Sequence, residues 1–192
     1  MPTPDDGGPG AHDASTPPEL RGLIDFLNSR PTARRAERFD TPANAAAFLA
    51  RCELSYDGRQ LSPRDTARLK QLRDALIRAV EQPNDRDVWE ALDAAIQSTT
   101  VSLKTDTGPA LKLVATASNP ADAVIADILT QLTYATITGR WQRLGTCARC
   151  RRVFYDSTRS HTRRWCNYAT CGNRANTAAF RSRQRAERTT KA

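Results

Sequence analysis

Apolar residues recur at helical spacing in five segments of the first 140 residues. Three of these segments open with a hydroxyl or amide residue and then proline: Thr41 and Pro42, Ser62 and Pro63, Asn119 and Pro120. A capping side chain followed by proline at the first helical position is a strong start signal. The fourth segment begins at Asn84 or Asp85. The pattern predicts helices within 20–30, 41–54, 62–82, 84–98 and 119–139.

The periodicity changes between the fourth and fifth segments. Residues 100–104 and 110–117 are rich in β-branched residues and alternate apolar with polar, and 106–109 (Asp-Thr-Gly-Pro) separates them. This predicts a β-hairpin, so the first 140 residues form a mainly helical body with one hairpin before its last helix. Its predicted inward-facing residues are Leu23, Phe26, Leu27, Leu69, Leu72, Leu76, Val80, Val88, Leu92, Ile96, Val124, Ile125, Ile128, Leu129 and Leu132.

Charge divides the chain into two parts. Residues 140–192 hold 14 Lys and Arg against 2 acids, whereas residues 1–139 hold 15 against 19. A basic C-terminal region indicates a polyanionic partner rather than a particular fold. Residues 1–16 are acidic and rich in Pro and Gly, unlike a signal peptide, and predict a disordered leader. Without a membrane-spanning apolar run, we expect a cytoplasmic protein with reduced thiols.

The helical body, residues 17–140, carries no catalytic motif. It lacks a Gly-rich phosphate loop, an H-E-x-x-H pair and a G-x-S-x-G turn, so we expect a protein that is not an enzyme. Asp25 and Asn28 lie one turn apart and could form a polar site, but a helix cap or a buried hydrogen bond is the favoured interpretation. Cys52 fits a small buried apolar residue.

Four of the five cysteines lie within 25 residues: Cys147, Cys150, Cys166 and Cys171. Their spacing, C-x2-C followed by C-x4-C, is typical of four-cysteine zinc sites. Four sulfur ligands fill a tetrahedral site, so the single Zn²⁺ would be structural. Disulfides, an iron–sulfur cluster and replacement of one thiolate by His161 are the open alternatives.

Arginines follow the last cysteine at helical spacing. A helix from about residue 172 places four of them on one stripe: Arg174, Arg181, Arg185 and Arg188. The opposite face is expected to pack against the zinc unit and holds Ala175, Ala179, Phe180 and Ala186. A one-sided cationic stripe with few acids nearby indicates nucleic-acid phosphates as its partner. Arg163 and Arg164, between the cysteine pairs, are further candidate contacts and partly offset the thiolate charge.

The C-terminal region resembles the CGNR zinc finger, named for a tetrad that here is Cys171, Gly172, Asn173 and Arg174. The upstream blocks LIDFLNSR, LRDALIRAV and LVATAS are similar to the ABATE domain that usually precedes this finger. The resemblance extends over nearly the whole chain beyond the leader. It implies zinc held by the four cysteines, a treble-clef-like finger over 141–188 with a tail at 189–192, and DNA binding by a stress-induced transcription regulator of bacteria.

Together these patterns predict a mainly α protein with one β-hairpin in its helical domain and a small C-terminal finger made of a hairpin and a helix. We expect a nucleoid-associated regulator that binds double-stranded DNA, with the body acting as a sensor or dimerisation domain. An RNA-binding or ribosome-associated protein and an enzyme with an unrecognised site in the body are the alternatives. A homodimer and a small-molecule ligand of the body stay open.

Overall fold

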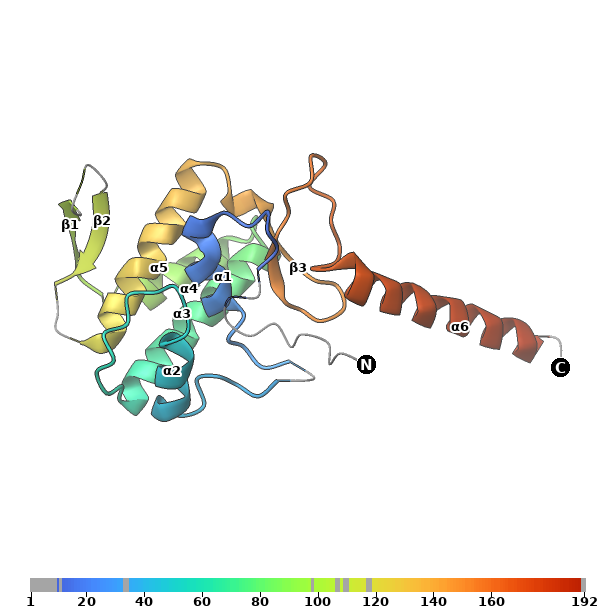
Figure 1. Ribbon diagram of the computed structural model, residues 1–192, viewed down its shortest axis with the longest axis horizontal. Helices are drawn as coiled ribbons and strands as arrows, with labels where there is room; N and C mark the ends of the chain where they lie inside the picture. The colour runs from blue at the N-terminus through green and yellow to red at the C-terminus, as the bar shows by residue number, and fades with distance from the viewer. Residues whose placement is uncertain are drawn as a thin grey trace.

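The computed structural model describes residues 10, 12–32, 35–97, 99–105, 108, 111–116 and 119–190, with backbone only at 185 and 187–190. In the body, a short 3₁₀ turn leads into helices that enclose one core, and a hairpin precedes the last helix (Figure 1). The elements are η1 (Pro18–Leu20), α1 (Arg21–Leu27), α2 (Pro42–Leu49), α3 (Pro63–Glu81), α4 (Arg86–Ile96), β1 (Val101–Thr105), β2 (Leu111–Ala115) and α5 (Pro120–Ile137).

The C-terminal region adds a second hairpin and a long helix. Gly139, at φ +67°, follows the C-terminal end of α5. The elements that follow are η2 (Trp141–Arg143), β3 (Leu144–Thr146), β4 (Val153–Tyr155), a π-helical turn η3 (Tyr168–Gly172) and α6 (Asn173–Thr190). Both hairpins are two-stranded and antiparallel. The predicted fold class, mainly α with a hairpin in the body and a hairpin plus helix in the finger, is confirmed.

The helices begin where their capping residues lie. Thr41, Ser62 and Asn119 each accept a backbone N–H at the starts of α2, α3 and α5, as predicted. At α3 the carboxylate of Asp65 also accepts the N–H of Ser62 at 2.8 Å, which completes a capping box. Asp85 caps α4. Satisfying these N–H groups locally fixes where each helix enters the core.

The core of the body is built around α1. Leu23, Phe26 and Leu27 are fully buried in it, as their spacing predicts. The helix is short and contacts both α3 and α5, which supply most of the surrounding apolar side chains. None of the helices in the described ranges is long and apolar enough to cross a membrane.

The second hairpin joins this core. Trp141, Leu144, Val153 and Tyr155 are buried in the same apolar cluster as the helices of the body. Asn28, at the end of α1, donates from Nδ2 to the carbonyl of Val153 at 2.9 Å and accepts the Val153 N–H at 2.8 Å. The favoured interpretation of Asn28, a buried hydrogen bond, is therefore confirmed. The body and the base of the finger share one core across the predicted boundary at 140/141.

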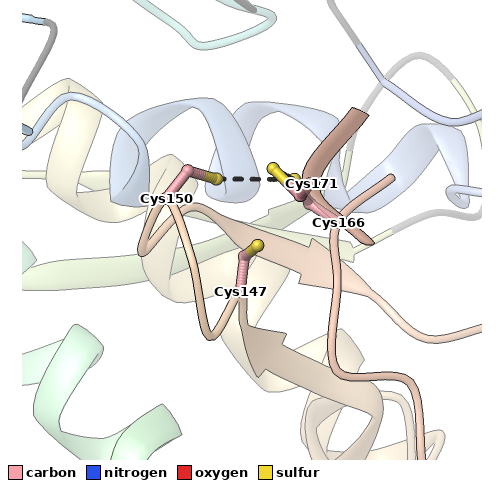
Figure 2. A group of neighbouring side chains, drawn as sticks. All are labelled: Cys147, Cys150, Cys166 and Cys171. Carbon is pink, nitrogen blue, oxygen red and sulfur yellow. Dashed lines mark hydrogen bonds between the residues drawn. The ribbon is translucent and has the colours of Figure 1, made fainter. Parts of the chain in front are cut away.

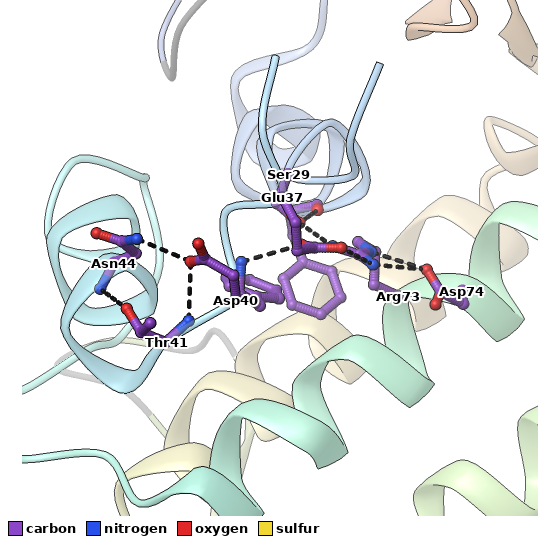
Figure 3. Close-up of polar contacts among 9 residues, drawn as sticks. Ser29, Glu37, Asp40, Thr41, Asn44, Arg73 and Asp74 are labelled. Atoms are coloured by element: carbon purple, nitrogen blue, oxygen red, sulfur yellow. Dashed lines mark hydrogen bonds and ion pairs between the residues drawn. The ribbon is translucent and has the colours of Figure 1, made fainter. Parts of the chain in front are cut away.

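The segment between α1 and α2 is held by a buried ion cluster (Figure 3). Arg73 of α3 is 1% exposed and donates to Glu37 at 2.9 Å, and its guanidinium lies 5.5 Å from the ring centre of Phe39. Burial acts to raise the pKa of Glu37, but the hydrogen bonds from Arg73 and from the Phe39 N–H, together with the charge of Arg73, lower that pKa overall. Arg73 also donates to Ser29, so the cluster fixes the chain beside Asn28.

Part of the predicted disordered leader packs against the body. Thr16 is 4% exposed, and the Nε2 atom of His12 lies 3.2 Å from a carboxylate oxygen of Asp25. The N–H of Gly10 also donates to Asp25 at 3.0 Å. Asp25, like Asn28, therefore serves as a hydrogen-bond partner for a distant segment of the chain. The hydrogen-bonding needs of buried Asp25 give these residues a docking point that composition does not reveal. Residues 1–9 and 11 lie outside the described residues.

Candidate metal centre

The four clustered cysteines come from three segments of the finger. Cys147 and Cys150 lie in the turn between β3 and β4, Cys166 lies in the loop after β4, and Cys171 lies in η3 (Figure 2). All four Sγ atoms are within 4.8 Å of one another. The Cys150–Cys166 distance is 3.5 Å and the Cys166–Cys171 distance is 3.8 Å.

These distances fit a tetrahedral ion. Zinc with four bonds to sulfur of about 2.3 Å separates its ligands by about 3.8 Å. No disulfide joins the four cysteines. In the described part of the chain, His161 is outside the group of potential ligands, and its side chain is exposed. The predicted ligand set is thus brought together as one metal-binding group, and the donor set suits zinc.

Backbone hydrogen bonds shape the turn that carries the first pair. The Cys147 N–H donates to the carbonyl of Arg152 at 2.8 Å, and the Arg151 N–H donates to the carbonyl of Cys147 at 2.9 Å. The Ala148 N–H donates to the carbonyl of Arg164 at 3.0 Å, which ties this turn to the loop segment before Cys166. Arg151 has φ +63°, a left-handed conformation that usually favours glycine.

Contacts outside the turn hold Arg151 in this conformation. Its guanidinium lies 2.8 Å from Glu81 of α3, and its carbonyl accepts a hydrogen bond from Arg30. Arg30 also pairs with Glu81 at 3.3 Å. The metal-binding turn is therefore attached to α3 and to the segment after α1, in addition to the bonds made by Asn28.

The sulfur atoms influence one another's protonation. Hydrogen bonds from Cys150 and Cys166 lower the pKa of the Cys147 thiol. Cys150 and Cys166 each share a hydrogen bond with Cys147, and this bond raises the pKa of both thiols. A divalent cation among the sulfurs would replace these protons as the positive partner, which couples metal binding to proton release. Cys52 behaves differently, because burial raises the pKa of its thiol and it donates to the Phe48 carbonyl.

Arg163, predicted as a nucleic-acid contact, is directed into the finger. Its Nε donates to the carbonyl of Trp165 at 2.9 Å, and a second nitrogen donates to the carbonyl of Cys166. The guanidinium lies 5.2 Å from the ring centre of Phe154 and 3.1 Å from Asp13 of the docked leader. These contacts position the ligand Cys166 and leave the side chain 20% exposed.

Two residues of the finger that sequence reasoning missed also organise its loops. Asp156, 5% exposed, accepts the N–H groups of Thr158 and Arg163 at 2.9 Å each. Asn167 accepts the Thr170 N–H at 3.0 Å and so caps η3. The signal for Asp156 is the Asp-x-Thr pattern typical of a side chain that closes a turn on the backbone two residues later.

The Cys171-Gly172-Asn173-Arg174 tetrad forms the entry to α6. A Cβ atom on Gly172 would lie 2.7 Å from Cδ2 of Tyr168 and 3.1 Å from Cδ1 of Trp165, so any larger residue would displace the Tyr168 ring. Asn173 is exposed, and the N-cap of the preceding turn η3 is Asn167. Arg174 is half-buried, and its guanidinium makes no hydrogen bond or ion pair with any residue that the structure describes.

The long helix α6 projects from the finger away from the rest of the molecule (Figure 1). The prediction that its alanine face packs against the metal unit is wrong: Ala179 and Ala186 are exposed and Phe180 is 53% exposed. The turn η3 directs the helix axis outward, so only the first turn, with Ala175 half-buried, reaches the finger.

The predicted basic contacts fall into separate places. Arg181 is exposed on α6. Arg164 is exposed at the loop, with its guanidinium 5.4 Å from the ring centre of Trp165. The side chains of Arg185 and Arg188 lie outside the described residues. Arg163 does not belong to this outward-facing group, because its guanidinium bonds to carbonyls of the metal loop.

Two family models match the chain, one mainly over the body and one over the finger. Residues 143–184 match the CGNR zinc finger. Residues 21–150, more than half of the chain, match the ABATE family, described as "Putative stress-induced transcription regulator". The two matches overlap at the turn that carries Cys147 and Cys150, where the body and the finger share their core. No curated protein matches the chain. The chain therefore belongs to the ABATE family and carries a CGNR zinc finger.

Proposed function

We propose that this protein is a transcription regulator that binds duplex DNA through α6, with one structural zinc ion fixing the start of that helix. The observation that carries the proposal is the projection of α6, with its exposed arginines, beyond the rest of the molecule (Figure 1). Its 18 residues correspond to a length of about 27 Å. A bare helix fits the major groove of B-DNA, which is about 12 Å wide.

Charge supports a polyanionic partner for this helix. Arg174 stands in the first turn, where the helix dipole disfavours a cation. Within the described residues it has no carboxylate or carbonyl partner, so a phosphate would supply the missing anion. Arg181 extends the surface, and the sequence places Arg185 and Arg188 on the same stripe. Arg164 would add a contact at the base of the helix.

The metal has a structural role in this proposal. Four sulfur ligands fill the tetrahedron around zinc and leave no position for a substrate or an activated water. We accordingly infer a binding protein without catalytic activity. As a regulator that binds DNA, it would act at the nucleoid in the cytoplasm. The body would carry the sensing or dimerisation role, because its helices form the core to which the finger is attached.

Exposed aromatic residues support RNA or single-stranded DNA as a second candidate partner. Tyr168 is 65% exposed at the start of η3, and the half-buried Trp165 lies under Arg164. Flat rings and guanidinium groups of this kind stack on unpaired bases. A preference for single strands would therefore assign binding to this loop rather than to the groove-sized helix.

A binding comparison tests the proposal on the full chain. Arg181→Ala with Arg185→Ala should weaken binding to duplex DNA and reduce the slope of log K against log salt by about two, because each lost phosphate contact removes about 0.9. The matched control is Arg64→Ala with Arg86→Ala, two exposed arginines of the body, which should bind like the unaltered protein.

Fluorescence anisotropy with duplex DNA, single-stranded DNA and a structured RNA separates the candidates. Tightest binding to the duplex supports the proposal. Tightest binding to RNA or single strands selects the second candidate. No binding to duplex at low salt, or a double variant that retains the full affinity and slope, refutes the role of α6.

A further inference from the structure

The hairpin β1–β2 lies at the side of the body, with β1 as its outer strand (Figure 1). Strand β2 faces α5, and the N–H of Leu113 donates to Oγ1 of Thr130 on that helix at 3.1 Å. In the described ranges, β1 pairs with β2 alone. One edge of this small sheet is thus closed by a helix and the other is a strand edge.

The ladder determines which backbone groups β1 presents outward. The Thr116 N–H donates to the Thr100 carbonyl at 3.0 Å, so residues 100, 102 and 104 bond to β2. Antiparallel pairs alternate, and therefore the N–H and C=O groups of Val101, Leu103 and Thr105 point away from β2. The outward bond of Leu113, the partner of Leu103, agrees with this phase. Among the described residues, none bonds to these outward groups.

Large apolar side chains accompany this edge. Leu103 is 62% exposed and Leu111 is 59% exposed. Leu103 stands opposite Leu113, and Thr105 stands opposite Leu111, so these four side chains share one face of the hairpin. A strand edge beside exposed leucines is a surface that proteins normally cover or blunt.

We propose that a second copy of this chain covers it, by antiparallel pairing of β1 with β1 around a two-fold axis at Leu103. In this register Val101 bonds with Thr105 of the second copy and Leu103 bonds with Leu103. Three residues on each strand then exchange their outward N–H and C=O groups. The result is a four-stranded sheet whose central row reads Leu113, Leu103, Leu103, Leu113.

Charge selects this register and this occupant. With the axis at Leu103, Lys104 faces Ser102 of the second copy, so the new pairing adds no cation beside the Lys104–Lys112 pair that the hairpin already contains. Moving the axis to residue 104 would place Lys104 against Lys104, which is unfavourable, and moving it to residue 102 would shorten the match. The strand is therefore complementary to itself and needs no charged partner of another kind.

The geometry also limits assembly to two copies. After pairing, both strand edges of the hairpin are used or covered: β1 by the second copy and β2 by α5. A two-fold interface of this type closes on itself, whereas an unblocked second edge would allow growth into a fibre. The proposed interface lies on the body, and its formation does not depend on nucleic-acid binding.

Sedimentation equilibrium of the full chain tests the dimer. Protein concentrations from about 1 to 200 μM are appropriate, because interfaces below about 1,200 Å² are usually weak. Leu103→Lys should weaken dimerisation at least tenfold, which corresponds to about 1.4 kcal/mol, by placing two lysines opposite each other. The matched control is Ile137→Lys: this residue is 77% exposed at the end of α5, and the change should leave the dimer intact.

A charge exchange tests the register. Leu103→Lys and Leu103→Glu proteins should each self-associate at least tenfold more weakly than the unaltered protein, and an equimolar mixture should form heterodimers, because residue 103 faces itself only in the proposed register. Native mass spectrometry distinguishes the heterodimer by mass. The proposal is overturned if the unaltered protein is monomeric throughout, if Leu103→Lys dimerises as well as Ile137→Lys, or if the two charged variants do not associate.

Discussion

Asn28→Ala is the substitution that tests whether the body and the finger fold as one unit. Asn28 is 8% exposed and satisfies both backbone groups of Val153, which is fully buried in β4. Alanine would leave the Val153 N–H at the former 2.8 Å contact and the carbonyl at the former 2.9 Å contact without partners. The loss falls on the junction between α1 and the hairpin of the finger.

The expected cost follows from those two groups. A buried donor or acceptor that loses its partner costs about 1–3 kcal/mol, which gives about 2–6 kcal/mol for the pair. The space left by the amide is polar and can admit a water, so we expect about 2–3 kcal/mol. With a urea m value near 2 kcal/mol/M, the unfolding midpoint should fall by about 1–1.5 M.

Two signals in one urea titration separate the parts of the molecule. In a Trp165→Phe background, fluorescence from Trp89 of α4 and from Trp141 of η2 reports on the core that the body shares with the base of the finger, while a chromogenic chelator reports on zinc release. Both transitions should move together to lower urea. Asn176→Ala, an exposed Asn on α6, is the matched control and should move neither. Zinc release that shifts while the tryptophan transition keeps its midpoint would refute the shared folding unit.

Two further predictions concern the metal centre. Cys166→Ser should abolish zinc binding in elemental analysis and also lower the thermal midpoint of the body in circular dichroism, because Val153 and Tyr155 pack in the common core; a body that melts unchanged would contradict this. Gly172→Ala should weaken zinc affinity about tenfold or more in competition with a chelator, because its Cβ would lie 2.7 Å from the Tyr168 ring. Adding Tyr168→Ala should recover most of the loss, whereas Gly145→Ala, whose Cβ meets Phe154 at 3.4 Å, should have little effect.

Local signals predicted most of the body. Caps followed by proline gave the starts of α2, α3 and α5, because the hydrogen bonds that define a helix start are made within three residues. Period 3.6 predicted the buried face of α1, and period 2 with the break at 106–109 predicted the hairpin. The metal ligands were equally predictable from the sequence, since cysteine spacing restricts the geometry of a turn directly.

Long-range contacts were not predictable in the same way. Asn28 bonds to Val153 across 125 residues, and Arg30 reaches the carbonyl of Arg151 across 121. Arg163 and Arg164 are adjacent arginines that the sequence does not distinguish. The guanidinium of Arg163 donates to carbonyls of the metal loop, whereas that of Arg164 is exposed to solvent. The predicted packing of the α6 alanine face failed because the direction of a helix depends on the turn before it.

The shared core determines how the finger can be studied and how the body can influence it. Ending the chain at 140 would remove Leu144, Val153 and Tyr155 from the core of the body and expose their apolar partners to water. Binding experiments therefore require the full chain. In the opposite direction, β4 follows directly on the turn of Cys147 and Cys150, and it is bonded to the end of α1. A ligand that displaced α1 would strain the bonds to Val153 first, and through them the base from which α6 projects.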